Sequence, residues 1–310
     1  MNPRLARKAV AFAGLLAFFA LALPYAYGQA DGQKTFSSSK EAVDGFIQAV
    51  RDRNTSTVLA ILGPGTEEIV SSSDPVADRT ARDRFLSRYD AKHSLAKSAP
   101  DELSLNIGTD DWPFPIPLVH ANNKWYWDGA AGKEEILYRR IGANELAAIN
   151  VCKGIVAAQH DYAAVGHDGL SAGVYAQRVK SEAGKQNGLY WEVSEGENPS
   201  PAGPLVAQAS SEGYAGAQQR GDPYHGYYYH MLKGQGGNAK GGAKSYIVDG
   251  NMSGGFAFLA YPADYRSSGV MTFVVSESGT IYQKDLGEKT SDLAQQMTEY
   301  NPDNTWKVVK

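Results

Sequence analysis

Hydrophobic residues return every three or four positions between residues 40 and 54, the spacing of one face of an α-helix. They are Ala42, Val43, Phe46, Ile47 and Val50, and the serines 37–39 precede them as candidate N-caps. This pattern predicts an amphipathic helix. A second helix is predicted over Thr55–Leu62, ending at Gly63-Pro64-Gly65, and a third, with poorly defined ends, within residues 74–96.

The pattern then changes to alternation, which is typical of strands with one buried face. Residues 102–107 alternate, with Leu103, Leu105 and Ile107 on one side, and residues 118–121 and 124–128 form two short runs around Asn122-Asn123. An Asn-Asn pair between two such runs predicts a β-hairpin. Helices followed by a small curved antiparallel sheet indicate an α+β unit with a cone-like core over residues 29–140.

A long helix is predicted next, over residues 132–162, and it connects this first part to a second one over residues 141–310. A shorter helix is expected over residues 174–183, and a closing helix over residues 292–300. Strands are expected at residues 223–232, 245–248, 255–261, 270–276 and 280–284, as a C-terminal antiparallel meander. Residues 195–220 and the Gly-rich stretch 234–242 are predicted loops. The fold class predicted for the whole chain is therefore α+β.

One apolar run stands apart from these patterns, AVAFAGLLAFFALAL over residues 9–23, behind the basic residues Arg4, Arg7 and Lys8. It is shorter than the roughly 20 apolar residues that span a bilayer. A basic head, a short apolar stretch and small residues at its end, here Ala26 and Gly28, are the parts of a secretory signal peptide. We expect a signal peptide over residues 1–28, cut between Gly28 and Gln29, with Ala30 as a second candidate site. An uncleaved N-terminal anchor is the alternative.

This reading predicts a periplasmic or secreted protein with no membrane span after signal removal. Cleavage after Gly28 would leave 282 of the 310 residues and change the formal net charge from −4 to −7, because the removed segment carries three positive charges and no negative one. A chain this acidic lacks the basic surface that a general nucleic-acid binder needs. Its 43% hydrophobic and 21% charged residues are typical of a folded protein.

Longer motifs resemble a known family. The strings WPFPIPLV (112–119), AGKEEILYRRIGANEL (131–146) and GGFAFLAYPADYRSSGVMTFVVSESGTIYQKDLG (254–287) are similar to those of the exported bacterial family called domain of unknown function 2950, over nearly the whole mature chain. The resemblance implies no activity and no catalytic residues. In arrangement, the first part resembles a nuclear-transport-factor-2-like cone and the second the globular part of a pilin or pseudopilin, although pilins begin with their hydrophobic helix.

Residues that carry chemistry form no convincing cluster along the chain. Among six histidines, the closest approach to a metal site is His160, Asp161, His167 and Asp168, whose spacing does not turn the ligands to one point, so we expect no metal and no cofactor. No Gly-x-Ser-x-Gly motif occurs, and the glycines of residues 234–242 lack P-loop spacing. The single cysteine, Cys152, lies among apolar helix positions, which indicates a buried, inert thiol; a disulfide between two chains is the alternative.

Aromatic side chains are the most distinctive candidates for binding. Tyr224, Tyr227 and Tyr229 lie in one predicted strand, and Trp191 precedes them; they could stack on a sugar or anchor a protein, or fill the core beneath the sheet. If the first unit holds a cavity, its polar groups are expected among Tyr89, His93, His120 and Trp125.

We therefore expect first a non-enzymatic module that binds an envelope component or a protein partner. A pocket holding a histidine–carboxylate or Ser–His pair within hydrogen-bond distance would count against this expectation. The alternatives are a small-molecule-binding or hydrolytic enzyme that uses the cone, and a pilin-like assembly component. The catalytic residues, if there are any, are unknown from sequence.

Overall fold

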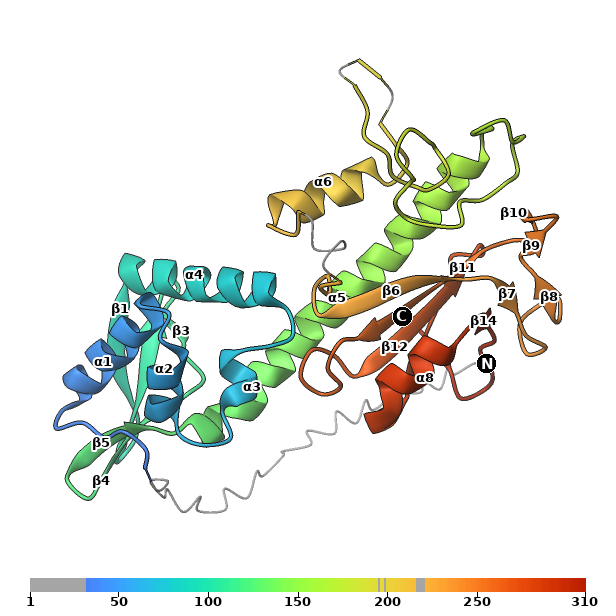
Figure 1. Ribbon diagram of the computed structural model, residues 1–310. Helices are drawn as coiled ribbons and strands as arrows, with labels where there is room; N and C mark the ends of the chain where they lie inside the picture. The colour runs from blue at the N-terminus through green and yellow to red at the C-terminus, as the bar shows by residue number, and fades with distance from the viewer. Residues whose placement is uncertain (1–31, 195, 198, 216–220) are drawn as a thin grey trace, which may run out of the picture.

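The computed structural model describes residues 32–194, 196–197, 199–215 and 221–310. The predicted signal peptide and its cleavage site at Gly28 and Gln29 lie outside the described residues. Two groups of helices and strands are joined by one long helix, α5 (Gly129–Ala163), as Figure 1 shows. We call residues 32–128 the first unit and the described residues from 164 onward the second unit. The chain has the predicted α+β fold.

The first unit begins with four helices, α1 (Ser39–Arg51), α2 (Thr55–Leu62), α3 (Glu67–Val70) and α4 (Pro75–Ala91). Each of the three longer ones starts where a side chain accepts a hydrogen bond from a free backbone N–H. Ser38 caps α1, Asn54 caps α2, and Asp74 caps α4 ahead of Pro75. The predicted helices at 40–54 and 55–62 are thus confirmed.

A five-stranded sheet completes the first unit. Its strands are β1 (His93–Ala99), β2 (Glu102–Ile107), β3 (Trp112–Pro113), β4 (Leu118–Ala121) and β5 (Lys124–Trp127), in the order β1-β2-β4-β5 with β3 beside β2. The predicted hairpin is confirmed: Asn122 and Asn123 both have positive φ, 51° and 59°, which a two-residue turn between antiparallel strands requires.

The core of the first unit is rich in aromatic rings. Phe46 from α1 lies 5.1 Å from Trp127 of β5 and 5.7 Å from Phe114, and Phe85 of α4 packs on Phe114 at 5.1 Å between ring centroids. Trp127 is fully buried, and its indole N–H donates to the Ala42 carbonyl over 3.1 Å. The helices are therefore fixed to the sheet by large side chains with defined ring geometry.

Helix α5 belongs to both cores. Its first turns carry Ile136 into the core of the first unit, and its later turns carry Ala148, Cys152 and Ile155 into the core of the second. The boundary predicted between residues 140 and 141 falls inside this helix. By length and composition alone α5 is apolar enough to cross a membrane, but the same test is met by a helix that packs inside a protein, as these residues of α5 do.

The second unit holds α6 (Gly203–Ser211), the 3₁₀ turn η1 (Gly287–Lys289) and α8 (Thr290–Gln296). Its strands are β6 (Tyr227–Leu232), β7 (Gly234–Gln235), β8 (Lys244–Ser245), β9 (Ile247–Val248), β10 (Asn251–Met252), β11 (Ala257–Pro262), β12 (Met271–Ser276), β13 (Ile281–Asp285), β14 (Glu299–Tyr300) and β15 (Lys307–Val308).

The main sheet of this unit is antiparallel, with the order β15-β13-β12-β11-β6, and α5 packs against β11 and β12. Strand β11 is buried along its whole length, because α5 covers one face and α8 contacts it as well. Shorter strands form a three-stranded sheet, β14-β7-β8, and a two-stranded one, β10-β9. The predicted meander is confirmed in β11, β12 and β13.

Four element predictions were wrong. Residues 174–183 form no helix: the side-chain amide of Gln159 pairs with both backbone groups of Ala176, at 2.8 and 2.9 Å, and holds this segment extended. The loop predicted over residues 195–220 contains α6, and the one over 234–242 contains β7. The closing helix, predicted over residues 292–300, ends at Gln296. The helix predicted within residues 74–96 is confirmed as α4, and β1 begins two residues after its end.

Candidate functional site

A cavity of about 790 Å³ lies where the first unit and α5 meet Glu212, Tyr214 and His225 of the second unit. Its floor is apolar and comes from the core of the first unit. The main side chains of this floor are Phe46, Val70, Phe85, Phe114, Ile116 and Ile136. The cavity therefore lies on the side of the first unit that faces α5.

Charged side chains surround this floor. Six arginines line the cavity, Arg53, Arg82, Arg84, Arg88, Arg139 and Arg140, together with four carboxylates, Asp74, Asp78, Asp110 and Glu212, and with His225. Helix α4 supplies three of the arginines. An apolar interior with a strongly charged lining is the arrangement of a site for an amphipathic molecule.

The four carboxylates are all engaged by groups of the protein. Asp78 accepts hydrogen bonds from the backbone N–H and the hydroxyl of Ser72, at 2.9 and 2.7 Å. Asp110 pairs with Arg88, whose hydrogen bond holds the pKa of this carboxyl below its ordinary value. Asp74 and Glu212 are bound by the residues described below.

Three of the arginines are engaged too. Arg88 pairs with Asp110, and Arg139 pairs with Glu135 while its guanidinium lies 4.9 Å from the ring centre of Trp112. Arg140 donates to two backbone carbonyls at the start of α3, those of Glu68 and Ile69, at 2.6 and 3.2 Å. Arg53, Arg82 and Arg84 make no ion pair with any described residue.

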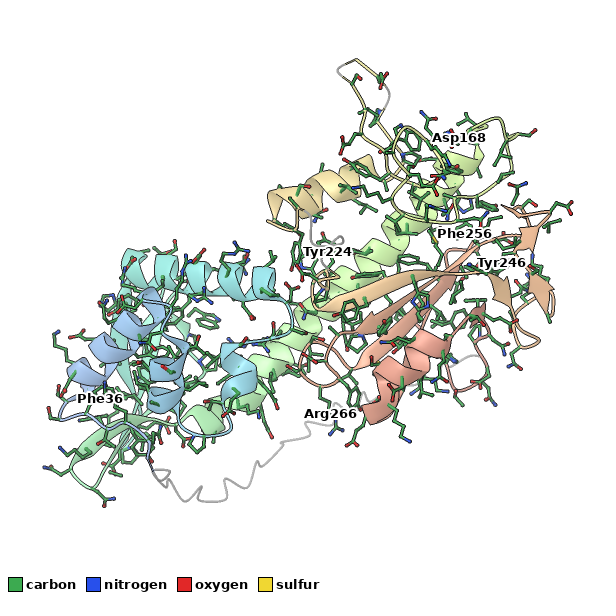
Figure 2. The ribbon with its side chains drawn as sticks, in the orientation of Figure 1. Phe36, Asp168, Tyr224, Tyr246, Phe256 and Arg266 are labelled. Carbon is green, nitrogen blue, oxygen red and sulfur yellow. The ribbon has the colours of Figure 1, made fainter. Side chains whose placement is uncertain are left out.

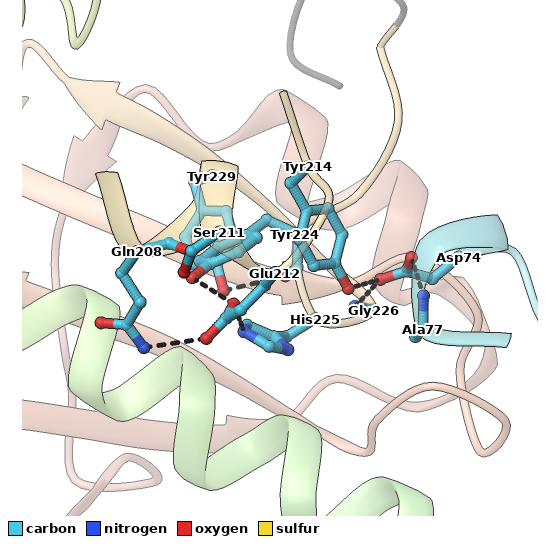
Figure 3. Close-up of polar contacts among 10 residues, drawn as sticks. All are labelled: Asp74, Ala77, Gln208, Ser211, Glu212, Tyr214, Tyr224, His225, Gly226 and Tyr229. Atoms are coloured by element: carbon cyan, nitrogen blue, oxygen red, sulfur yellow. Dashed lines mark hydrogen bonds and ion pairs between the residues drawn. The ribbon is translucent and has the colours of Figure 1, made fainter. Parts of the chain in front are cut away.

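Asp74 joins the two units. It is 2% exposed, and one of its oxygens accepts from the backbone N–H groups of Val76 and Ala77, at 3.1 and 2.9 Å, at the start of α4. The other oxygen accepts from the hydroxyl of Tyr214 and the N–H of Gly226, at 2.8 and 3.0 Å (Figure 3). Burial raises the pKa of Tyr214, and the neighbouring carboxylate adds to this, so the phenol stays protonated and donates.

Glu212, at the end of α6, accepts hydrogen bonds from a second set of donors (Figure 3). One carboxylate oxygen lies 2.9 Å from Nε2 of His225 and 3.1 Å from the hydroxyl of Tyr224, and the other accepts from Gln208 at 3.0 Å. His225 has a φ of 49°, a left-handed backbone conformation that non-glycine residues seldom adopt. The cavity wall thus includes a histidine–carboxylate pair, the feature that counts against a purely non-enzymatic module.

The aromatic candidates of the second unit do not line this cavity. Tyr227 is fully buried in the second core, where its hydroxyl donates to the Met271 carbonyl over 2.9 Å. The hydroxyl of Tyr229 donates to the Tyr224 carbonyl at 3.2 Å, and the hydroxyl of Tyr224 donates to the Glu212 carboxylate. Tyr224, labelled in Figure 2, packs against the cluster of Val76 and Tyr214, where the second unit contacts α4. Trp191 packs elsewhere, 5.3 Å from the ring of His167, so the structure does not bring it together with the tyrosines.

The candidates of the first unit also lie outside the lining of the cavity. Tyr89 is buried and its ring stacks on His93 at 3.9 Å between centroids, while Nδ1 of His93 bonds the Tyr89 carbonyl. His120 and Trp125 face each other across β4 and β5, with ring centres 4.8 Å apart. Most charged groups of the cavity come from α4, α5 and the second unit instead, together with Arg53 after α1 and Asp110 after β2.

Other candidate chemistry is accounted for by local contacts. His160 bonds the Glu277 carbonyl at 3.1 Å, and the two ring nitrogens of His167 bond Gln186 and the Tyr162 carbonyl. Among the described residues no group of histidine, cysteine and carboxylate side chains has the arrangement of a metal site. Cys152 is fully buried, and this burial raises the pKa of its thiol to about 12, as expected for an inert thiol.

Comparison with known proteins places the chain in a family but gives it no activity. A family model described as "Protein of unknown function (DUF2950)" matches residues 33–309, which is nearly the whole chain. No curated protein and no solved structure matches this chain. The resemblance to nuclear-transport-factor-2-like cones and to pilins that the sequence suggests is not tested by these comparisons.

Proposed function

Since this chain belongs to the DUF2950 family, whose function is unknown, its role has to be argued from its own residues, and we propose that it binds a small molecule in the cavity between the first unit and α5. The observation that carries this proposal is the cavity itself, about 790 Å³ with an apolar floor and a charged lining. Pockets for small ligands commonly have volumes of roughly 300–1,000 Å³ and combine apolar walls with a few polar groups.

We further propose that the protein does this outside the cytoplasm. The support is the basic head, the 15-residue apolar run of residues 9–23 and the small residues at Ala26 and Gly28, which together are typical of a signal peptide. The ligand would then be a molecule of the envelope or the medium.

Binding can be measured with N-phenylnaphthylamine, an uncharged aromatic probe whose fluorescence rises in an apolar site. Val70 lines the cavity, and V70W would fill part of its volume. Val248 is 47% exposed on β9, away from the cavity, so V248W is the matched control. We expect V70W to weaken probe binding at least about tenfold and V248W to leave it unchanged. Equal binding by both variants would contradict a ligand site in this cavity.

Hydrolysis is a second candidate function, and the His225–Glu212 pair favours it. If Nε2 of His225 carries the proton that Glu212 accepts, Nδ1 is left as a base. Nδ1 would take a proton from water while the water oxygen bonds to the carbonyl carbon of an ester. The ester C–O bond then breaks, and the leaving alkoxide takes the proton back from His225, giving an acid and an alcohol.

This candidate is tested by release of nitrophenol from para-nitrophenyl butyrate. H225Q should lower the rate by about 100-fold or more, the usual contribution of a general base. H120Q, a change in the hairpin of the first unit, is the control and should keep the rate. A wild-type protein with no rate above that of H225Q would rule out this role.

A further inference from the structure

We infer that the ligand of the cavity is an amphipathic anion, with its acidic group toward Arg82, Arg84 and Arg53 and its apolar part on the phenylalanine floor. This inference rests on the proposed binding function and adds the chemical class of the ligand. The acidic group is a carboxylate, sulfonate or phosphate, because guanidinium groups bind these anions through paired N–H donors.

The first argument is the charge balance of the lining. Every carboxylate there already accepts hydrogen bonds or an ion pair from the protein, as shown for Asp74, Asp78, Asp110 and Glu212. Among the described residues of the lining, no acidic group is thus left over to hold a cationic ligand. The arginines are in excess, and Arg53, Arg82 and Arg84 have no anion among the described residues.

The second argument is the placement of the arginines on α4. Arg84 and Arg88 are four residues apart and therefore neighbours on one side of the helix. Like charges at this spacing repel each other, and Asp110 offsets the charge of Arg88 only. A bound anion beside Arg84 would relieve this repulsion.

The third argument is a buried donor without an acceptor. Nε of Arg88 is shielded from solvent and makes no hydrogen bond, although Nη2 of the same guanidinium pairs with Asp110. A buried N–H without a partner costs free energy, and such groups in a pocket wall often await a ligand atom. An anionic oxygen in the cavity would supply the missing acceptor.

The fourth argument is the floor, which gives the ligand its apolar part. Phe46, Phe85 and Phe114 form one connected group, with ring centroids 5.1 to 6.0 Å apart. Phe85 and Arg84 are adjacent on α4, so the aromatic floor and the cationic groups are contributed by the same helix.

Two probes with the same ring system test the inference. Anilinonaphthalene sulfonate is N-phenylnaphthylamine with one added sulfonate, so their difference in affinity reports the recognition of a negative charge. We expect the sulfonate to bind the wild type at least about tenfold more tightly than the uncharged probe, the size of one charge-assisted hydrogen bond. The variant R82Q/R84Q should abolish this preference and retain binding of the uncharged probe.

The matched control is R79Q, because Arg79 is on the same helix, exposed, and outside the lining of the cavity. R79Q should keep the preference for the sulfonate. If wild type binds both probes equally, or if R79Q and R82Q/R84Q lose the preference alike, the inference is wrong while the proposed binding function stands. If neither probe binds and V70W makes no difference, the proposed function fails with it.

Competition then distinguishes the sources of the acidic group. Decanoate and decyl phosphate should displace the sulfonate probe, and the one with the lower half-displacing concentration identifies a carboxylate or a phosphate ligand. Decanol has the same chain without a charge and should displace it at least about tenfold less well. Displacement by decanol as strong as by both anions would overturn the inference.

Discussion

A single side chain, Asp74, carries four of the hydrogen bonds that fix α4 and connect the two units. It caps α4 through Val76 and Ala77 and also accepts from Tyr214 and Gly226 of the second unit. Removing the carboxylate leaves these donors buried without an acceptor, and each such loss costs on the order of 1 kcal/mol. We expect D74A to lower the free energy of unfolding by about 3 kcal/mol.

The conservative variant D74N separates the two roles. Asparagine keeps a carbonyl oxygen that can cap α4, but its amide cannot accept from both Tyr214 and Gly226, so an intermediate loss is expected. D83A is the control, because Asp83 is exposed on the same helix. Urea denaturation followed by circular dichroism measures all three; a loss for D74A no larger than for D83A would contradict this role of Asp74.

Cys152 gives a second prediction at this scale. Its side chain is fully buried and its thiol has a pKa of about 12, so almost no reactive thiolate is present in the folded protein at pH 8. We expect dithiodipyridine to react with native protein at least about 100-fold more slowly than with protein in urea. Rapid labelling of the native state, or a disulfide-linked dimer on a non-reducing gel, would show that the thiol is accessible.

At the scale of elements, the junction of α5 with the first unit depends on close approach at its first turns. A Cβ at Gly132 would lie 2.6 Å from Cγ1 and 2.8 Å from Cα of Ile116, and at Gly129 it would lie 2.4 Å from the Leu62 carbonyl. Gly142 is exposed on the same helix, and a Cβ there meets nothing within 4 Å. Substitution by alanine should therefore change the stability of the protein in opposite directions at Gly132 and Gly142.

We expect G132A to destabilise the protein by about 1–3 kcal/mol, because backbone atoms must move. G142A should stabilise it by about 0.5–1 kcal/mol, since alanine loses less conformational entropy than glycine when it joins a helix. Thermal unfolding of both variants measures the difference. An unchanged G132A would show that α5 does not contact the first unit as described, and a destabilised G142A would show that Gly142 does not have the open surroundings described for it.

The elements that the sequence predicts well are those with local causes. The helix α1 follows from an apolar face and a serine cap, and the turn at Asn122-Asn123 from residues that tolerate positive φ. The segment at residues 174–183 was mispredicted because its backbone partner, Gln159, comes from α5. Sequence patterns report local preference, and contacts between distant residues override it.

The candidate site was harder still to predict from the sequence, because its residues come from distant parts of the chain. Asp74 and Tyr214 are 140 residues apart in the chain, and Glu212 and His225 are separated by a stretch that the sequence shows as a loop. No spacing rule connects such residues. The arginines of α4 were the one available signal, because Arg82, Arg84 and Arg88 recur within two turns of a predicted helix.

At the scale of the whole molecule, the two units are coupled by one helix and by contacts beside it. Glu145 of α5 accepts from the backbone N–H groups of Val270 and Met271, at 3.0 and 2.9 Å, and Asn144 donates to the Ser268 carbonyl at 2.9 Å. Because the cavity is lined from both units and from α5, a ligand in it would stabilise their relative arrangement by mass action.

At the N-terminus, cleavage of the predicted signal peptide is expected to leave the contacts of the folded chain in place. Gln33 is buried, and its side-chain amide donates to the carbonyls of Ile61 and Trp127, at 2.9 and 2.6 Å. Cleavage after Gly28 would leave residues 29–32 ahead of this anchored residue, so the contacts of Gln33 would be kept. If the protein is exported as proposed, we expect its intact mass to show that it begins at Gln29.

A pair of variants tests the position of the cut. An arginine does not fit the small pocket of signal peptidase, so G28R should block processing and leave the precursor with the membrane fraction. A30R should be processed like wild type if the cut follows Gly28. If the cut follows Ala30, both G28R and A30R should block processing, because Gly28 and Ala30 are then the two small residues of the site. A wild-type protein that keeps Met1 or residues 9–23 and sediments with membranes would establish an uncleaved anchor, and the cavity would then act at the membrane surface.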